Sequence, residues 1–193
     1  MADTSWLDDL AVERLEMVLE QTDDDARLLG DGEHVSGPSA AEYKTRVKGA
    51  ARFAGRALTQ VRNVERLLAS ADPAIHHGDG MTCVWRAETA VCRQATIEAG
   101  LLHPDGPEQS ECRSTCTNLA YTDRDIAQLR DRHQAVTAGA TDPLAPRPLR
   151  DRASAIADRL QTVIERHEQT RLAVPPPPSP HRGDRSTDEP PTP

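Results

Sequence analysis

The feature that most constrains this chain is a cluster of four cysteines, which are the only cysteines among its 193 residues. Cys83, Cys92, Cys112 and Cys116 lie within one 34-residue window and follow the spacing C-x8-C-x19-C-x3-C. Glycine and proline are frequent in this window, which predicts turns and loops. Four thiols in a short, loop-rich stretch are typical of a structural metal site or of two disulfides. Either would hold the middle of the chain together.

The N-terminal residues favour the metal over the disulfides. Met1–Leu10 contains three aspartates and no basic residue, so it lacks the charged and apolar regions of a secretory signal. No stretch approaches the roughly 20 apolar residues that a membrane-spanning helix needs. We therefore expect a cytoplasmic protein without membrane contact. Disulfides rarely persist in the cytoplasm.

Zinc is the metal that four thiolates most commonly hold in a closed structural site. Cys112 and Cys116 are four residues apart, about one helical turn, so both sulfurs can face one ion. The spacing of Cys83 and Cys92 is wider than the spacing of a common zinc knuckle. We expect a structural Zn²⁺ held by all four cysteines.

The sequence leaves other chemical roles of the thiols open. His76, His77 or His103 could replace one of the cysteines as a ligand. An iron–sulfur cluster also takes four cysteines, although its familiar close spacings are absent here. Disulfides remain an alternative, and buried thiols without a ligand behave as small apolar groups. No nearby general base or open coordination position is indicated, so a catalytic metal is not expected.

The rest of the sequence predicts a mostly α-helical protein. Its five aromatic residues rule out a large core of bulky rings, whereas abundant alanine and leucine suit close packing of helices. We expect about four helices, with the loop-rich cysteine segment between the second and the third. They are predicted at residues 5–29, 39–69, 122–138 and 150–172. A capping box formed by Thr122 and Asp125 marks the start of the third helix.

The chain is predicted to have four successive parts. They are an acidic helical arm over 1–34, a basic helix with the four-cysteine module over 39–138, a C-terminal helix over 149–173 and a disordered tail over 174–193. The tail is rich in proline and almost without apolar residues, so it has nothing with which to build a core.

Charge is distributed unevenly along the chain, whose net charge is −8. Residues 1–34 hold eleven acidic residues and two arginines, whereas residues 40–70 hold seven basic residues and two glutamates. One face of the second helix carries a cation every four residues, which we call the basic ridge: Lys44, Lys48, Arg52 and Arg56. This ridge can neutralise DNA phosphates. The alternatives are a solvated helix face or a docking surface for the acidic arm.

Two further polar groups carry no predicted chemistry. His76 and His77 stand next to Gly78 and are expected in a loop. The acidic run over 23–25 is interpreted as a solvated helix end. Phosphate-binding glycine loops and hydrolase motifs such as GxSxG and HExxH are absent from the sequence, and we therefore expect no enzymatic activity.

Two segments around the cysteines match a known pattern. Residues 81–92 read MTCVWRAETAVC and residues 111–123 read ECRSTCTNLAYTD. They resemble the Cys-rich C-terminal region of actinobacterial tyrosine recombinase/integrase-like proteins of mobile elements, in which C-x3-C-x-N precedes a Thr-Asp helix start. Asn118, Thr122, Asp123 and Leu129 match that pattern. The similarity covers about residues 38–135 of this chain.

The resemblance stops short of the catalytic core of those proteins. A tyrosine recombinase requires an arginine, a lysine, a His-x-x-Arg element and a nucleophilic tyrosine. Here both lysines lie in the second helix, and no His-x-x-Arg element precedes Tyr43 or Tyr121. The resemblance thus implies a nonenzymatic accessory module of an integrase- or transposon-type mobile element that binds DNA or a recombinase. A zinc-stabilised helical protein–protein adaptor without DNA binding and an iron–sulfur or redox sensor are the alternatives.

Overall fold

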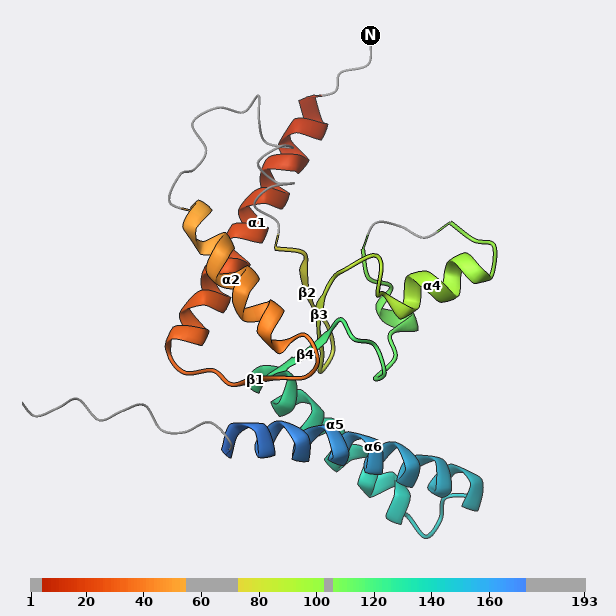
Figure 1. Ribbon diagram of the computed structural model, residues 1–193. Helices are drawn as coiled ribbons and strands as arrows, with labels where there is room; N and C mark the ends of the chain where they lie inside the picture. The colour runs from red at the N-terminus through yellow and green to blue at the C-terminus, as the bar shows by residue number, and fades with distance from the viewer. Residues whose placement is uncertain (1–4, 55–72, 103–105, 173–193) are drawn as a thin grey trace, which may run out of the picture.

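The computed structural model describes residues 5–54, 73–102 and 106–172 (Figure 1). Some sequence-based predictions lie outside the described residues. These are the second half of the second helix, the possible ligand His103, the ridge residue Arg56 and the tail over 174–193. The side chain of Arg52 is also outside them. Within the described ranges, no helix is both long and apolar enough to cross a membrane.

The described residues form five α-helices, one short 3-10 helix and four short strands. The helices are α1 Ser5–Gly30, α2 Ala40–Ala54, α4 Val91–Glu98, α5 Asp123–Thr141 and α6 Arg147–Leu172, with the 3-10 helix η2 at Gln109–Glu111. The strands are β1 Val35–Ser36, β2 Ile75–His77, β3 Thr82–Val84 and β4 Leu119–Thr122. The predicted first, third and fourth helices are confirmed to within a few residues.

The strands form one antiparallel sheet in the order β1-β4-β3-β2. The expectation of a mostly α-helical chain is therefore only partly right, because helices surround a sheet that the sequence did not predict. Each strand is two to four residues long, too short for the alternation of apolar and polar residues that indicates a strand. His76 and His77, which the sequence predicts in a loop, belong to β2, and β1 lies between the first and the second predicted helix.

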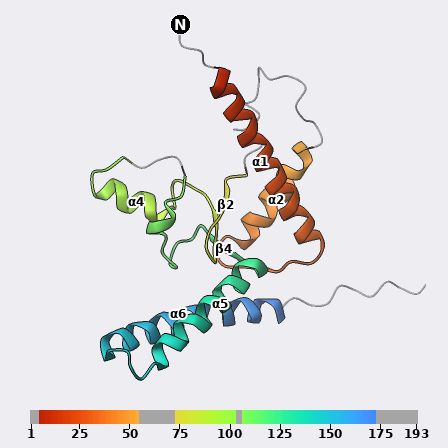
Figure 2. The same cartoon turned by 180° about the vertical axis from the view of Figure 1, so that it is seen from behind.

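The sheet lies at the centre of the molecule, as the two opposite views in Figures 1 and 2 show. Helices α1 and α2 pack on each other and lie on one side of the sheet. Helix α4 lies on the side away from them, and the hairpin of α5 and α6 lies below the sheet in both views. The cysteine segment thus extends from the sheet away from the two N-terminal helices.

The larger core joins α2 to every strand of the sheet. Its buried members are Val35, Tyr43, Val47, Ile75, Val84 and Ala120, with Ala26, Leu29 and Ala40 packed against them. Each strand therefore contributes one side chain to the same cluster. Burial of each of the larger apolar side chains contributes about 1.5–3 kcal/mol to stability. This apolar packing supports a sheet whose short strands form few hydrogen bonds.

The smaller core lies between α5 and α6, where Ile126 and Leu129 meet Ile164. The predicted capping box at the start of α5 is confirmed, because the Thr122 hydroxyl accepts a hydrogen bond from the Asp125 backbone N–H and the Asp125 carboxylate accepts one from the Thr122 N–H. The same carboxylate accepts a hydrogen bond from the Thr82 hydroxyl at 2.8 Å. The cap therefore also fixes α5 to strand β3.

The pleat of the sheet separates its side chains into two faces, because successive residues of a strand point to opposite sides. We call the side that holds Ile75, Val84 and Ala120 the core face. The cross-strand register places a different set on the other side, which we call the thiol face. The thiol face carries Ser36, His76, Cys83, Leu119 and Tyr121.

Candidate metal centre

The four cysteines come from four different segments of the fold. Cys83 is the middle residue of β3, and Cys92 lies in the first turn of α4. Cys112 directly follows η2, and Cys116 lies three residues before β4. Cys83, Cys92 and Cys116 are buried and Cys112 is half-buried, and all four are free thiols. The wide spacing of the first pair is bridged by the loop that leads from β3 into α4.

The pKa values of Cys83 and Cys112 are raised in part by other thiols of the set. Burial raises the pKa of Cys83 to about 12, with further contributions from Cys112, Cys116 and Cys92. Burial, followed by Cys116 and Cys92, also raises the pKa of Cys112. Thiolates placed so close together repel one another, and a bound cation removes that repulsion. That all four cysteines bind one ion stays a prediction.

The thiols do not form a finished coordination shell in this structure. Within the described ranges, no group of three or more His, Cys, Asp or Glu side chains is arranged closely enough to hold a metal ion. The donor set itself suits zinc, which takes four sulfurs at about 2.3 Å. Binding would require the four side chains to move closer together.

The two neighbouring histidines of β2 point to opposite faces of the sheet. His76 pairs with Cys83 in the register of β2 and β3, so the imidazole and the thiol lie on the same face, where directly opposed Cβ atoms are about 5 Å apart. His77 lies on the core face, where its ring bonds Thr82 and Asp25. Of the two, only His76 is placed where it can take part in the thiol centre.

Asn118 connects the two halves of the thiol centre. Its side-chain N–H donates to the carbonyl of Arg86 at 2.9 Å, and its side-chain oxygen accepts from the Thr89 hydroxyl at 2.5 Å. Arg86 and Thr89 lie in the loop before Cys92, whereas Asn118 is two residues after Cys116. The structure therefore gives a physical role to the asparagine that the resemblance singles out.

The basic ridge is only partly accessible within the described residues. Tyr43, Val47 and Ala50 form the buried side of α2. Lys44 is half-buried and Lys48 is exposed. Helix α1 packs against α2, but among the described ion pairs no α1 carboxylate meets either lysine. The described residues therefore show no ion pair between the acidic arm and these two lysines.

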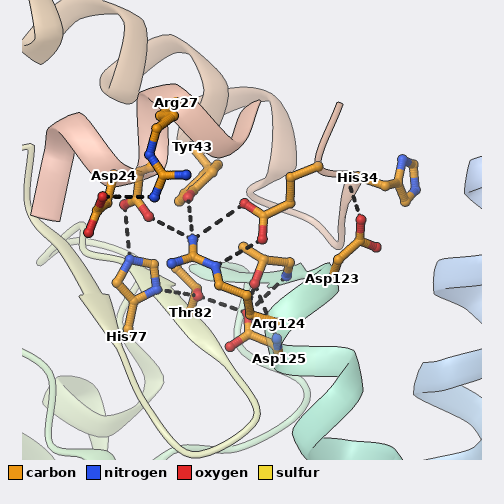
Figure 3. Close-up of polar contacts among 12 residues, drawn as sticks. Asp24, Arg27, His34, Tyr43, His77, Thr82, Asp123, Arg124 and Asp125 are labelled. Carbon is orange, nitrogen blue, oxygen red and sulfur yellow. Dashed lines mark hydrogen bonds and ion pairs between the residues drawn. The ribbon is translucent and has the colours of Figure 1, made fainter. Parts of the chain in front are cut away.

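A buried polar network on the core face was missed by the sequence interpretation (Figure 3). Asp25, whose side chain is 2% exposed, bonds Arg124 at 2.6 Å and His77 at 2.9 Å. Arg124 also pairs with Glu33 at 2.9 Å. Burial alone raises the pKa of Asp25, but the hydrogen bonds and charges of His77 and Arg124 outweigh it and hold that pKa below its ordinary value. The acidic run over 23–25 is therefore not wholly a solvated helix end.

A second polar network joins β1, α5 and α6 through His167, which is fully buried. Its Nδ1 lies 2.8 Å from the Ser36 hydroxyl and its Nε2 lies 2.9 Å from the Asp123 carboxylate. Asp123 also binds Arg171 and accepts a hydrogen bond from the backbone N–H of His34. The residue types are those of a hydrolase triad. However, this carboxylate is already engaged by a guanidinium, and the arrangement serves to connect three elements.

Comparison with known proteins adds no relative. No family model, curated protein or solved structure matches this chain.

Proposed function

We propose that this protein is a nonenzymatic binding module whose middle segment is held by one structural zinc ion at Cys83, Cys92, Cys112 and Cys116. We further propose that it serves an integrase- or transposon-type mobile element by binding DNA or a recombinase. The observation that supports the proposal is that three of the four thiols are buried and that other thiols contribute to the raised pKa values of Cys83 and Cys112. Four cysteines are a donor set that suits a structural zinc site.

The cysteine segment needs a source of stability other than apolar packing. Helix α4 is eight residues long, and Cys92 is its one buried residue. At its end, Leu101 and Leu102 are 64% and 99% exposed. A helix this short is marginal in water without tertiary packing. A metal that joined Cys92 to β3 and to the turn over 112–116 would supply the missing constraint.

The mobile-element assignment rests on the resemblance around the cysteines. Three of the matching residues have a clear structural task here. Asn118 ties the loops of the thiol centre, Thr122 caps α5, and Asp123 bonds the backbone N–H of the residue before β1 and the ring of His167 in α6. These contacts support reading the matching pattern as a folding unit.

Metal analysis tests the zinc. Protein purified without oxygen should contain about one zinc per chain, and Cys112→Ser or Cys116→Ser should lose it. Ser114→Ala, in the same turn but without a thiol, is the matched control and should keep the metal. Four freely titratable thiols and no metal in the unmodified protein would overturn the proposal. Colour and bound iron would instead favour the iron–sulfur alternative.

The exposed leucines after α4 favour a second candidate, a zinc-stabilised adaptor that binds another protein without DNA. A gel-shift titration separates the two candidates. DNA binding should weaken steeply with salt, because each neutralised phosphate releases counterions. An adaptor would show no shift even at low salt.

A further inference from the structure

A groove of about 610 Å³ lies next to the thiol centre, on the same side of the sheet. Its floor includes Ser36 of β1 and Tyr121 of β4, which are cross-strand partners on the thiol face. One wall is formed by Arg159 and Arg166 of α6. Ser114 and Thr115, the last two of the three residues between Cys112 and Cys116, also line the groove.

The groove is positively charged. Among the described residues that line it, there are two arginines and no carboxylate. Neither arginine takes part in any ion pair among the described residues, in contrast to Arg130, Arg147 and Arg171 of the same hairpin. Arg159 donates from Nε to the carbonyl of Ala155, which leaves its two terminal nitrogens for a ligand.

The acidic residues of α6 do not cancel this charge within the groove. Arg159 and Arg166 are seven residues apart and so lie on one side of the helix. Asp158 and Glu165 each precede one of them and are turned by about 100° around the axis. The chain as a whole carries a charge of −8, so attraction of an anion must be local and sensitive to salt.

Hydroxyl groups complement the two guanidinium groups. Ser114 and Thr115 line the groove and can each donate an O–H. The hydroxyl of Thr162, which also lines the groove, already donates to the carbonyl of Asp158. Arginine together with serine and threonine is the donor set that proteins present to phosphates of a nucleic-acid backbone.

We propose that this groove binds the backbone phosphates of DNA, with Arg159 and Arg166 as the principal contacts. This inference rests on the proposed function as a DNA-binding module, and it moves the main contact from the basic ridge of α2 to α6.

The groove is physically linked to the thiol centre. Tyr121, Arg166, Ser114 and Thr115 line the same groove, and Ser114 and Thr115 belong to the turn that joins Cys112 to Cys116. A metal that fixed the turn over 112–116 would also fix the part of the groove lined by Ser114 and Thr115. We therefore expect the metal to increase the affinity of the groove for DNA without contacting the DNA itself.

Two double variants with the same loss of charge test the proposal on the full chain with its metal. Arg159→Ala/Arg166→Ala removes the groove cations. Lys44→Ala/Lys48→Ala removes the two ridge cations whose side chains the structure describes. A labelled DNA duplex is titrated at several salt concentrations, and circular dichroism checks that each variant is folded. The groove variant should bind on the order of tenfold more weakly, and the slope of log affinity against log salt should fall by about 2. The ridge variant should bind like the unmodified protein.

Each alternative outcome is decisive. If only the ridge variant lost affinity, the proposal that the groove binds DNA would be overturned, whereas the proposed DNA-binding function would stand. Absence of DNA binding by the unmodified, zinc-loaded protein would overturn both. Poly-glutamate that competes as effectively as DNA at equal charge would identify an acidic protein segment as the ligand and would also overturn the phosphate proposal.

Discussion

The Thr89 hydroxyl donates a 2.5 Å hydrogen bond to the side chain of Asn118, across 29 residues of sequence. Asn118 is fully buried, and its amide nitrogen bonds the Arg86 carbonyl. One side chain therefore holds the loop that carries Cys92 against the turn that carries Cys116. The position of the two thiols relative to each other depends on this contact.

Replacement of Asn118 by alanine should loosen the thiol centre. The change leaves the Arg86 carbonyl and the Thr89 hydroxyl without a partner, which costs about 1–3 kcal/mol for a buried polar group. Zinc affinity should fall by about 10–100-fold, as it does when residues that orient ligands are removed. Chemical denaturation and competition with a chromogenic chelator measure the two effects. Thr117→Ala, an exposed neighbour, should change neither, and equal effects of the two variants would contradict this role.

Asp25 should matter far more to stability than its neighbour Asp24. Asp25→Asn removes the charge that Arg124 and His77 face in a buried site. Loss of one partner of a buried pair costs about 3–5 kcal/mol, and we expect the lower end because Arg124 is 40% exposed. Asp24 is 64% exposed and pairs only with Arg27. Asp24→Asn should therefore change the free energy of unfolding by less than about 0.5 kcal/mol in urea titrations.

Stability should fall in acid in two stages. The pKa of His34 is lowered, first by burial and then by the charges of His167 and Arg171, so its protonation favours the unfolded chain below about pH 6.5. Burial raises the pKa of Asp25 and of Asp123, but their bonds to positive groups and to N–H donors lower both overall. Their contribution is present above the unfolded pKa of about 3.9 and is lost as pH falls through the lowered folded values.

Urea titrations between pH 2 and 8 check this dependence. The free energy of unfolding should decline gently below about pH 6.5 and more steeply below about pH 4. Asp25→Asn should flatten the steep stage. A steep stage of unchanged size in that variant would show that other carboxylates are responsible for the acid sensitivity.

Gly80 and Gly139 should respond in opposite ways to alanine. Gly80 has a φ of +73°, and an added Cβ would lie 2.5 Å from a methyl carbon of Leu129. Gly139 lies inside α5 and has nothing within 4 Å of such a Cβ. Gly80→Ala should destabilise by at least about 1 kcal/mol, whereas Gly139→Ala should stabilise by roughly 0.5–1 kcal/mol. Thermal denaturation of the two variants gives the comparison, and a stable Gly80→Ala protein would contradict the close packing of the β2–β3 turn on α5.

Ser36 should serve stability rather than catalysis. Ser36→Ala leaves Nδ1 of the buried His167 without its partner, at a cost of about 1–3 kcal/mol. The exposed Ser154 of α6 provides the control, and Ser154→Ala should have little effect. Hydrolysis of p-nitrophenyl acetate should be the same for the unmodified protein and both variants. Ester hydrolysis that disappears only in Ser36→Ala would reveal a working triad.

The helices of this protein are readable from the sequence because their signals are local. The capping box at Thr122 and Asp125 and the apolar stripe with Ile126, Leu129 and Ile164 predict α5 and α6 to within a few residues. The four cysteines are also recognisable as one set, because no other thiols compete for the same assignment.

The sheet and the two polar networks are different, because the partners that create them are far apart in the chain. Val35 becomes a strand residue by pairing with Thr122, and Asp25 becomes a buried charge by meeting Arg124, 99 residues away. In the sequence, Asp25 is the last of three consecutive aspartates. Helical spacing puts Asp25 on the same side of α1 as Val18 and Leu29, but its partner Arg124 cannot be found from any local pattern.

Features that depend on interactions between nearby residues can be predicted from the sequence, whereas features that depend on distant residues cannot. Sequence alone predicted the first, third and fourth helices, since helix periodicity and capping act within a few residues. Tertiary structure alone decided that strands of two to four residues pair into a sheet, which face of that sheet carries Cys83, and that Arg159 and Arg166 line one groove with Ser114 and Thr115. Those relations depend on long-range hydrogen bonds and packing, which no short window of sequence contains.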